Sequence, residues 1–307
     1  MEAPKKTVLA SPASLPAGVR RFTLECGPMN DSELLRAIEA NVTAALAEDL
    51  GPGDPTAALI SPERRATARL ITREAAILCG QPWFEACFRR LDPDVIFHWR
   101  AAEGEALTVG MEVCEIEGKA RALLSAERSA LNFLQTLSAV ATVTRRYVEA
   151  VAGTRARIMD TRKTLPGLRV AQKYAVRVGG GVNQRMGLFD GILIKENHIA
   201  AAGGIAQVMA AARLAAPGLS IQIEVENLAQ LEEALAAGAT LVLLDNFPLA
   251  ALREAVRLAA GRAELEASGG INLSNVRAVA ETGVDRISVG SLTKHIQAVD
   301  FSLRIPL

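Results

Sequence analysis

The second half of the chain alternates short apolar runs with alanine-rich stretches, and this rhythm limits the possible folds more than any other feature. The stretches at 205–215, 228–237 and 249–260 have the periodicity of helices. Strands that alternate with helices pair in parallel, because each helix returns the chain across the sheet face. The apolar runs are ARIMD ending at Asp160, GILIK at Lys195, IQIEVE around Glu224, TLVLLD at Asp245, ELEAS at Ser268 and RISVG at Gly290.

These runs predict an α/β fold with an incomplete parallel barrel. A full barrel of this class has eight strand–helix units, whereas six runs are visible here. A doubly wound open sheet is the alternative. In a barrel, the strand ends gather at one mouth, where active sites lie. The polar or small residue that ends each run favours the barrel.

The residues at the predicted mouth indicate which ligands it binds. Glu224 and Asp245 end successive runs, and paired carboxylates are natural ligands of Mg²⁺, which prefers oxygen. Barrels often bind phosphate after their last strands, through backbone N–H groups and a helix N-terminus. The corresponding turns here are Ser268, Gly269 and Gly270, followed by Val289, Gly290 and Ser291.

Segment 160–185 concentrates positive charge in a chain with 34 Lys+Arg and 34 Asp+Glu. Arginine holds carboxylates or phosphates in a bidentate geometry, while lysine acts as a point charge. A ligand with several negative groups is therefore expected near Arg162 and Lys163, which directly follow a run. For Arg169 and Lys173, four residues apart, a solvated helix face is an equally good interpretation. The cations of the segment are Arg162, Lys163, Arg169, Lys173, Arg177 and Arg185.

The first half predicts a separate mixed α/β region without a repeated strand–helix rhythm. Its expected elements are a helix from Met29 to Asp49, strands within 66–79 and 95–116, a short helix at 83–91 and a long helix at 126–150. The expected organisation is a flexible tail over 1–25, an N-terminal domain over 26–130 to which 299–307 return, and the barrel over 131–298.

Charge, hydropathy and cysteine spacing exclude several functions. The balanced charge argues against nucleic acid as the main partner, and no stretch approaches the ~18 apolar residues of a membrane span. None of the cysteines forms a C-x-x-C pair, so metal-finger and redox motifs have little support. Buried free thiols in the reducing cytoplasm are expected instead. The cysteines are Cys26, Cys79, Cys87 and Cys114.

Several long strings, in the same order along the chain, resemble those of quinolinate phosphoribosyltransferases. They are EDLGPGDPT (48–56), ERSALNFLQTLSAVAT (127–142), DTRKTLPGLR (160–169), KYAVRVGGGVNQR (173–185) and DGILIKENHI (190–199), followed by IEVEN, LLDNF, EASGGI and GVDRISVGSLT. The resemblance covers about 30–307. It implies a type II phosphoribosyltransferase fold, with an N-terminal α/β sandwich and an incomplete α/β barrel, and a homodimer whose active sites lie at the subunit interface.

The resemblance also implies an activity and a set of roles. The reaction would be phosphoribosyl transfer from phosphoribosyl pyrophosphate to quinolinate with decarboxylation, for NAD synthesis. By resemblance, Arg162, Arg185 and Lys195 match residues that hold the quinolinate carboxylates. Arg128 matches an arginine that the neighbouring subunit contributes to the site. Lys163, Glu224 and Asp245 match positions around phosphoribosyl pyrophosphate and Mg²⁺. The matches to the 5-phosphate cradle are Ser268, Gly269 and Gly290, and His198 falls in the same site region.

One position departs from the family pattern. Relatives usually read Asn-His-Arg where this chain reads Asn183-Gln184-Arg185. By resemblance, Gln184 stands in the substrate pocket, in place of a histidine that helps to bind substrate. Glutamine can donate a hydrogen bond but cannot gain a proton, so a phosphoribosyltransferase for another aromatic acid is a serious rival. Two other classes stay open from the residues: a Schiff-base lyase using Lys195, and a non-catalytic phosphate-binding protein.

Overall fold

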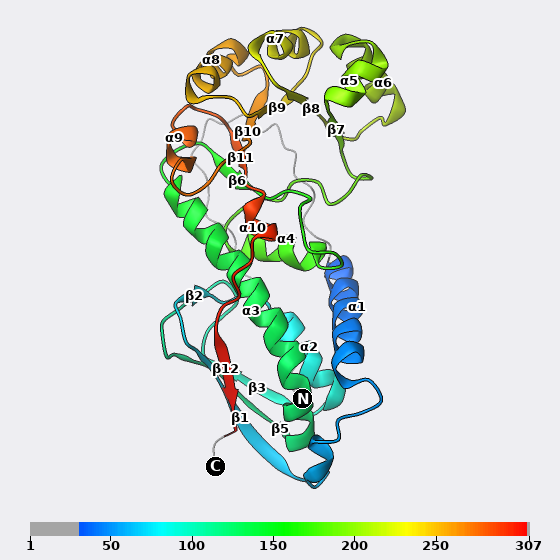
Figure 1. The fold of residues 1–307 in the computed structure, drawn as a ribbon, viewed down its shortest axis with the longest axis vertical. Helices are drawn as coiled ribbons and strands as arrows, with labels where there is room; N and C mark the ends of the chain where they lie inside the picture. Colours follow the sequence, from blue (N-terminus) through cyan, green and yellow to red (C-terminus); the bar gives the residue numbers. More distant parts are fainter. Residues whose placement is uncertain (1–30, 306–307) are drawn as a thin grey trace, which may run out of the picture.

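The computed structural model describes residues 31–305 and shows two domains joined by one long helix (Figure 1). The predicted tail over 1–25 and Cys26 lie outside the described residues. In the first domain, four strands form a sheet in the order β12-β1-β5-β3, with antiparallel neighbours. The strands are β1 (Arg65–Thr72), β3 (Ile96–Trp99), β5 (Glu112–Lys119) and β12 (Phe301–Arg304).

Strand β12 brings the end of the described chain back to the first domain. It pairs with β1, with Phe301 opposite Thr72. The stretches 66–79 and 95–116 each contain strands, as predicted, but both are interrupted. Turns at Gly104 (φ 86°) and Gly110 (φ 80°) break the second stretch. The short strands β2 (Ala76–Ile77) and β4 (Ala106–Leu107) pair separately.

Three helices, α1 (Asp31–Leu50), α2 (Gln81–Leu91) and α3 (Ala120–Ala150), pack together in this domain. The short helix η1 (Ala57–Leu59) contacts α3. Helix α2 buries the rings of Trp83, Phe84 and Phe88. Helix α3 begins at Ala120, six residues before the predicted start, and runs into the second domain (Figure 1). It therefore contributes to the apolar cores of both domains, with Leu134 in the first and Tyr147 in the second.

The second domain is an incomplete parallel barrel, which confirms the predicted fold class. The strand order is β6-β11-β10-β9-β8-β7. Consecutive strands from β7 to β11 are neighbours, and the first strand closes onto the last, so the sheet is open only between β6 and β7. A doubly wound sheet would reverse its order instead. The strands are β6 (Arg157–Met159), β7 (Ile192–Ile194), β8 (Ile221–Val225), β9 (Leu241–Asp245), β10 (Glu264–Ser268) and β11 (Arg286–Ser288).

Apolar residues from these strands pack against the connecting helices, while alternate residues face the barrel interior. Ile223, Val242 and Leu265 belong to the apolar core. Gln222 and Glu266 alternate with such residues and bond to each other, Nε2 to Oε2 at 2.9 Å. The helices are α4 (Arg169–Val178), α5 (Glu196–Ala202), α6 (Ile205–Ala215), α7 (Leu228–Ala236), α8 (Leu249–Ala259), α9 (Val276–Ala280) and α10 (Ser291–Lys294). Helices α6 to α8 match their predicted ranges within one residue.

Candidate active site

The predicted mouth residues lie at the carboxyl ends of neighbouring strands. Asp245 and Ser268 are the last residues of β9 and β10 and stand opposite each other in the ladder. Glu224 stands opposite Leu243, one residue before the end of β8. Because side chains alternate along a strand, Glu224, Asp245 and Ser268 share the inner face. The parallel register thus brings two carboxylates and a hydroxyl to one region.

Lys195 and Glu224 form an ion pair at this mouth. The Lys195 Nζ lies 3.0 and 2.8 Å from the two Glu224 carboxylate oxygens. The carboxylate is mostly buried, with 12% exposure, whereas the lysine side chain is 45% exposed. The family resemblance assigned these residues to different ligands. In the structure they are partners, because β7 and β8 are adjacent and both end at the mouth.

Lys163 lies beside the glycine turn that follows β11. A Cβ added to Gly290 would lie 3.3 Å from Lys163 Cδ and 3.9 Å from its Nζ. Gly269 and Gly270 have φ of 98° and 60°, a region that favours glycine. Ser291 begins α10 and is half-buried. The turns at Gly269–Gly270 and at Gly290 therefore carry few side-chain atoms, and the second of them lies beside the Lys163 ammonium.

Val289 differs from the other predicted phosphate-binding residues. Its side chain is buried in the barrel's outer core. Its backbone N–H donates to the carbonyl of Met159 at 3.0 Å. Neither its side chain nor its N–H is directed to the mouth.

Arg162 lies close enough to Arg185 to affect the pKa of the Arg185 guanidinium. Burial lowers the pKa of Arg185, and the neighbouring Arg162 cation lowers this pKa further, while Asp190 acts in the opposite direction. The Arg162 Nε is buried without a hydrogen-bond partner. A buried unsatisfied donor is costly, so this pair of guanidinium groups favours an anionic ligand.

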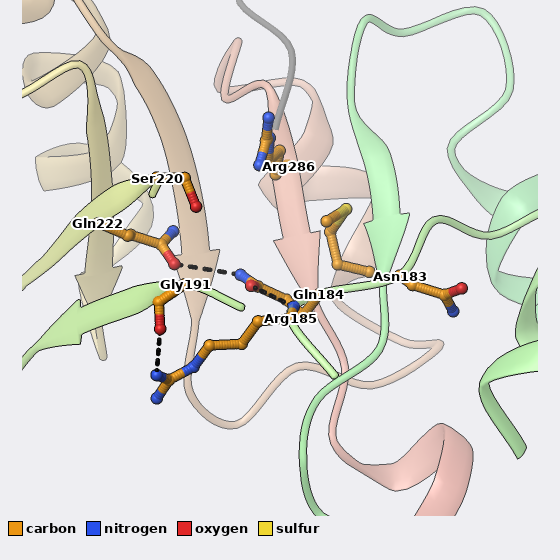
Figure 2. Close-up of a pocket in the computed structure, with 8 residues that line it drawn as sticks. Asn183, Gln184, Arg185, Gly191, Ser220, Gln222 and Arg286 are labelled. Carbon is orange, nitrogen blue, oxygen red and sulfur yellow. Dashed lines mark hydrogen bonds between the residues drawn. The ribbon is translucent and has the colours of Figure 1, made fainter. Parts of the chain in front are cut away.

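Gln184 points into the barrel interior (Figure 2). Its Nε2 lies 2.8 and 2.6 Å from the two Glu266 carboxylate oxygens and 3.2 Å from Gln222 Oε1. The Ser288 hydroxyl also donates to Glu266. The amide hydrogens of Gln184 are thus directed at Glu266 and Gln222 inside the barrel. The family resemblance predicts a substrate-binding role for this side chain. Figure 2 also shows Arg185, whose Nη1 donates to the carbonyl of Gly191 at 2.7 Å.

Two further predicted residues have different surroundings. His198 is exposed on α5, and its Nδ1 accepts the Lys195 backbone N–H at 3.0 Å, which fixes the start of that helix. Arg128 is exposed on the part of α3 whose neighbours Ala126 and Ala130 belong to the first domain's core. Within one subunit, Arg128 is therefore not among the side chains gathered at the mouth.

Sequence reasoning missed the role of Asp160, which it treated only as the end of a strand. Asp160 is fully buried and pairs with Lys173, also fully buried, at 2.5 Å. Its carboxylate accepts the Gln184 N–H at 2.8 Å and an Asn183 amide hydrogen at 2.6 Å. Burial raises the pKa of Asp160, and Lys173 acts to lower it. The solvated-face interpretation of Lys173 is therefore wrong.

An incomplete α/β barrel whose mouth combines a cationic cluster, two carboxylates and glycine turns defines an enzyme of the phosphoribosyltransferase class. Comparison with family models gives two matches: the quinolinate phosphoribosyl transferase N-terminal domain over residues 54–138 and its C-terminal domain over 140–304. The chain belongs to the quinolinate phosphoribosyltransferase family.

Similar proteins agree with this assignment. A probable nicotinate-nucleotide pyrophosphorylase [carboxylating] of Bacillus subtilis is 42% identical over 85% of this chain and 90% of its own length. The nicotinate-nucleotide pyrophosphorylase [carboxylating] of Mycobacterium leprae is 42% identical over 87% of this chain and 96% of its own length. The structure of nicotinate-nucleotide pyrophosphorylase from Francisella tularensis superposes with a TM-score of 0.86, at 44% identity, covering 88% of this chain and 96% of that one. Among the described residues, no helix is long and apolar enough to cross a bilayer.

Proposed function

We propose that this chain transfers the phosphoribosyl group of phosphoribosyl pyrophosphate to quinolinate, with loss of CO₂, and so makes nicotinate mononucleotide for NAD synthesis in the cytoplasm. The observation that carries this proposal is the Arg162–Arg185 pair, whose buried unpartnered Nε and mutual repulsion favour a ligand with two negative groups. The names of the similar proteins support the same reaction.

The two guanidinium groups would hold the acceptor's carboxylates and align its ring nitrogen with the anomeric carbon. Alignment of two substrates removes part of the entropic barrier to their reaction. The nitrogen attacks that carbon, the C–O bond to pyrophosphate breaks, and the ring nitrogen becomes cationic. The adjacent carboxylate then leaves as CO₂, because the cationic nitrogen stabilises the electron pair left on carbon. A proton replaces it, and no protein nucleophile is required.

The donor would lie on the other side of the mouth. Lys163 is placed to stabilise the charge that grows on the departing pyrophosphate. The 5-phosphate would bind at Ser268, Gly269, Gly270, Gly290 and Ser291. Gly269 and Gly270 have positive φ angles, which glycine adopts readily, and Gly290 has no Cβ beside Lys163. Lys195, which is paired with Glu224, would contribute positive charge between the acceptor side and the donor side of the mouth.

The carboxylates suit a shared Mg²⁺ site. In residues 31–305, no group of three or more His, Cys, Asp or Glu side chains could hold a metal. Mg²⁺ commonly binds one or two carboxylates together with substrate phosphates and water, and Glu224 and Asp245 share the inner face of neighbouring strands. The ion would supply charge neutralisation for the pyrophosphate when that substrate is bound.

The exposed Arg128 supports a shared active site in a homodimer. It lies away from its own subunit's mouth, and in the proposed C2 dimer it would contribute to the neighbour's mouth. A Schiff-base lyase is less well supported, because the Lys195 Nζ is engaged by both carboxylate oxygens of Glu224 and is not directed at an open carbonyl site. The balanced charge of the chain gives no support to nucleic acid as a partner.

A product assay tests the proposal directly. The protein is incubated with quinolinate, phosphoribosyl pyrophosphate and Mg²⁺, and nicotinate mononucleotide and CO₂ are measured. Both products should form in equal amounts. Absence of nicotinate mononucleotide, or borohydride trapping of a carbonyl substrate on Lys195, would overturn the assignment.

A further inference from the structure

We propose that Arg169 and Lys173, one turn apart on α4, are positioning residues that fix the spacing of Arg162 and Arg185 and thereby set the selectivity for a dicarboxylate acceptor. This inference rests on the proposed function. Arg169 bonds to backbone carbonyls of both segments that carry the acceptor-binding arginines. Lys173 bonds to the Asp160 carboxylate of the first segment and to the Gln184 carbonyl of the second.

Arg169 joins the two segments through one guanidinium group. Its Nη2 donates to the carbonyl of Arg162 at 3.3 Å, and its Nη1 donates to the carbonyl of Met186 at 3.1 Å. Its Nε donates to Thr164 Oγ1 at 3.1 Å. The rigid planar fork of arginine fixes several acceptors at set distances, which a lysine cannot do.

Lys173 makes a second link one turn along the helix. Its Nζ donates to Asp160 at 2.5 Å and to the carbonyl of Gln184 at 2.6 Å. Asp160 also accepts the Gln184 N–H at 2.8 Å and an Asn183 amide hydrogen. Asp160, two residues before Arg162, and Gln184, immediately before Arg185, are therefore tied together through one buried ion pair.

The open side of the barrel explains why such links are needed. No ladder joins β6 to β7, and segment 182–186 meets β6 through a single bridge between Val182 and Met159. Arg162 and Arg185 are also two like charges in one site; burial lowers the pKa of Arg185, and the neighbouring Arg162 cation lowers this pKa further. Without Arg169 and Lys173, the two segments would keep only the Val182–Met159 bridge and the bonds of an unpaired Asp160 carboxylate to Asn183 and Gln184.

Helix α4 is itself held firmly against the first domain. A Cβ on Gly179, at its end, would lie 2.6 Å from the Ala141 carbonyl oxygen of α3. On its other side, the Tyr174 ring packs on Trp83 with 5.4 Å between centroids. Arg169 and Lys173 thus extend from a helix whose position is fixed by packing. The packing of α4 therefore determines the spacing between Arg162 and Arg185.

The experiment compares Arg169→Lys with wild type and with Arg177→Gln. Arg177 lies on the same helix but is exposed, so Arg177→Gln shows whether changing any α4 cation, even with loss of its charge, alters the acceptor site. Arg169→Lys keeps the charge but loses the planar guanidinium that bonds to several acceptors. Its KM for quinolinate should rise about tenfold, while its KM for phosphoribosyl pyrophosphate should stay within about twofold of the wild-type value. The kcat/KM ratio of quinolinate to nicotinate should fall about tenfold. Arg177→Gln should leave all three values unchanged.

A second variant separates positioning from folding. Lys173→Met alone would leave the Asp160 charge buried and unpaired, which is strongly destabilising. The double variant Asp160→Asn/Lys173→Met removes both charges and should fold, with the same selective loss of quinolinate affinity. Calorimetry with the unreactive dicarboxylate phthalate measures acceptor binding without turnover.

The outcomes distinguish the two proposals. If wild type makes no product from quinolinate, the proposed function fails. If wild type is active but Arg169→Lys keeps its acceptor selectivity, or both KM values rise together, the positioning role is wrong. Unchanged phthalate affinity in both variants would likewise overturn it.

Discussion

The ammonium of Lys195 lies 2.8 and 3.0 Å from the two carboxylate oxygens of Glu224, so the ends of β7 and β8 are joined by an ion pair inside the proposed site. The acceptor-binding and metal-binding roles implied by the family resemblance therefore fall on two residues that act as a unit. Removal of either partner leaves the other charge uncompensated at the mouth.

This pairing predicts non-additive losses of activity. Lys195→Met and Glu224→Gln should each lower kcat/KM, and the double variant should lose less than the product of the two factors. For a partly exposed pair, the coupling should be roughly 1 kcal/mol. Steady-state kinetics on the four proteins measure it. Strictly multiplicative losses would show that the two side chains act independently.

The two acceptor arginines predict a preference for dicarboxylates. Nicotinate lacks one carboxylate and should be a poor substrate, because a lost charged contact costs ~2 kcal/mol or more, roughly thirtyfold. Relative kcat/KM values for quinolinate and nicotinate test this. Comparable turnover of the two acids would refute the assignment of Arg162 and Arg185.

The shared carboxylates predict dependence on Mg²⁺. Chelation should abolish turnover, and added Mg²⁺ should restore it. Asp245→Asn should raise the Mg²⁺ concentration needed for half-maximal activity. Glu226→Gln is the matched control, since Glu226 is an exposed acid just after β8. Full activity in excess chelator, or equal effects of the two substitutions, would contradict the metal site.

The position of Arg128 predicts complementation between inactive subunits. Arg128→Ala and Arg162→Ala subunits should each be inactive. After exchange, a mixed dimer has one site with both changes and one with neither, so activity should recover toward half the wild-type value per mixed dimer.

A control makes this test two-sided. The double variant Arg128→Ala/Arg162→Ala is mixed with wild type. If Arg128 acts across the interface, each site of that mixed dimer carries one change and the mixed dimer is inactive. If Arg128 acts within its own subunit, mixing the double variant with wild type gives half-active dimers. Mixing the two single variants then gives no active mixed dimer.

The buried cysteines predict slow thiol chemistry in the folded protein. Burial raises the pKa of Cys87 and of Cys114 to about 12, and that of Cys79 is raised as well. The thiolate is the reactive form, so these thiols should not react with a disulfide reagent at pH 8. In a Cys26→Ser background, labelling should require denaturant. Rapid labelling of the native protein would contradict the burial of these side chains.

The sequence predicted the features that follow from periodicity. Alternating runs led to the parallel barrel, and the last residues of those runs led to Asp245 and Ser268 at its mouth. Contacts that depend on register or on side-chain direction were not predictable. The Lys195–Glu224 pair and the inward direction of Gln184 depend on which strands are neighbours. The spacing of Arg169 and Lys173 also suits a solvated helix face, because their acceptors are the Asp160 carboxylate and loop carbonyls that only the folded chain brings beside α4.

Helix α3 has a consequence for folding. It supplies buried residues to both apolar cores, so neither core is complete without a segment that also belongs to the other. Loss of one domain would fray the helix on which the other is built, and heat or urea should unfold the chain in one cooperative transition. A cut between residues 138 and 140, where the two matched family regions meet, would divide this helix and yield two fragments that cannot fold separately.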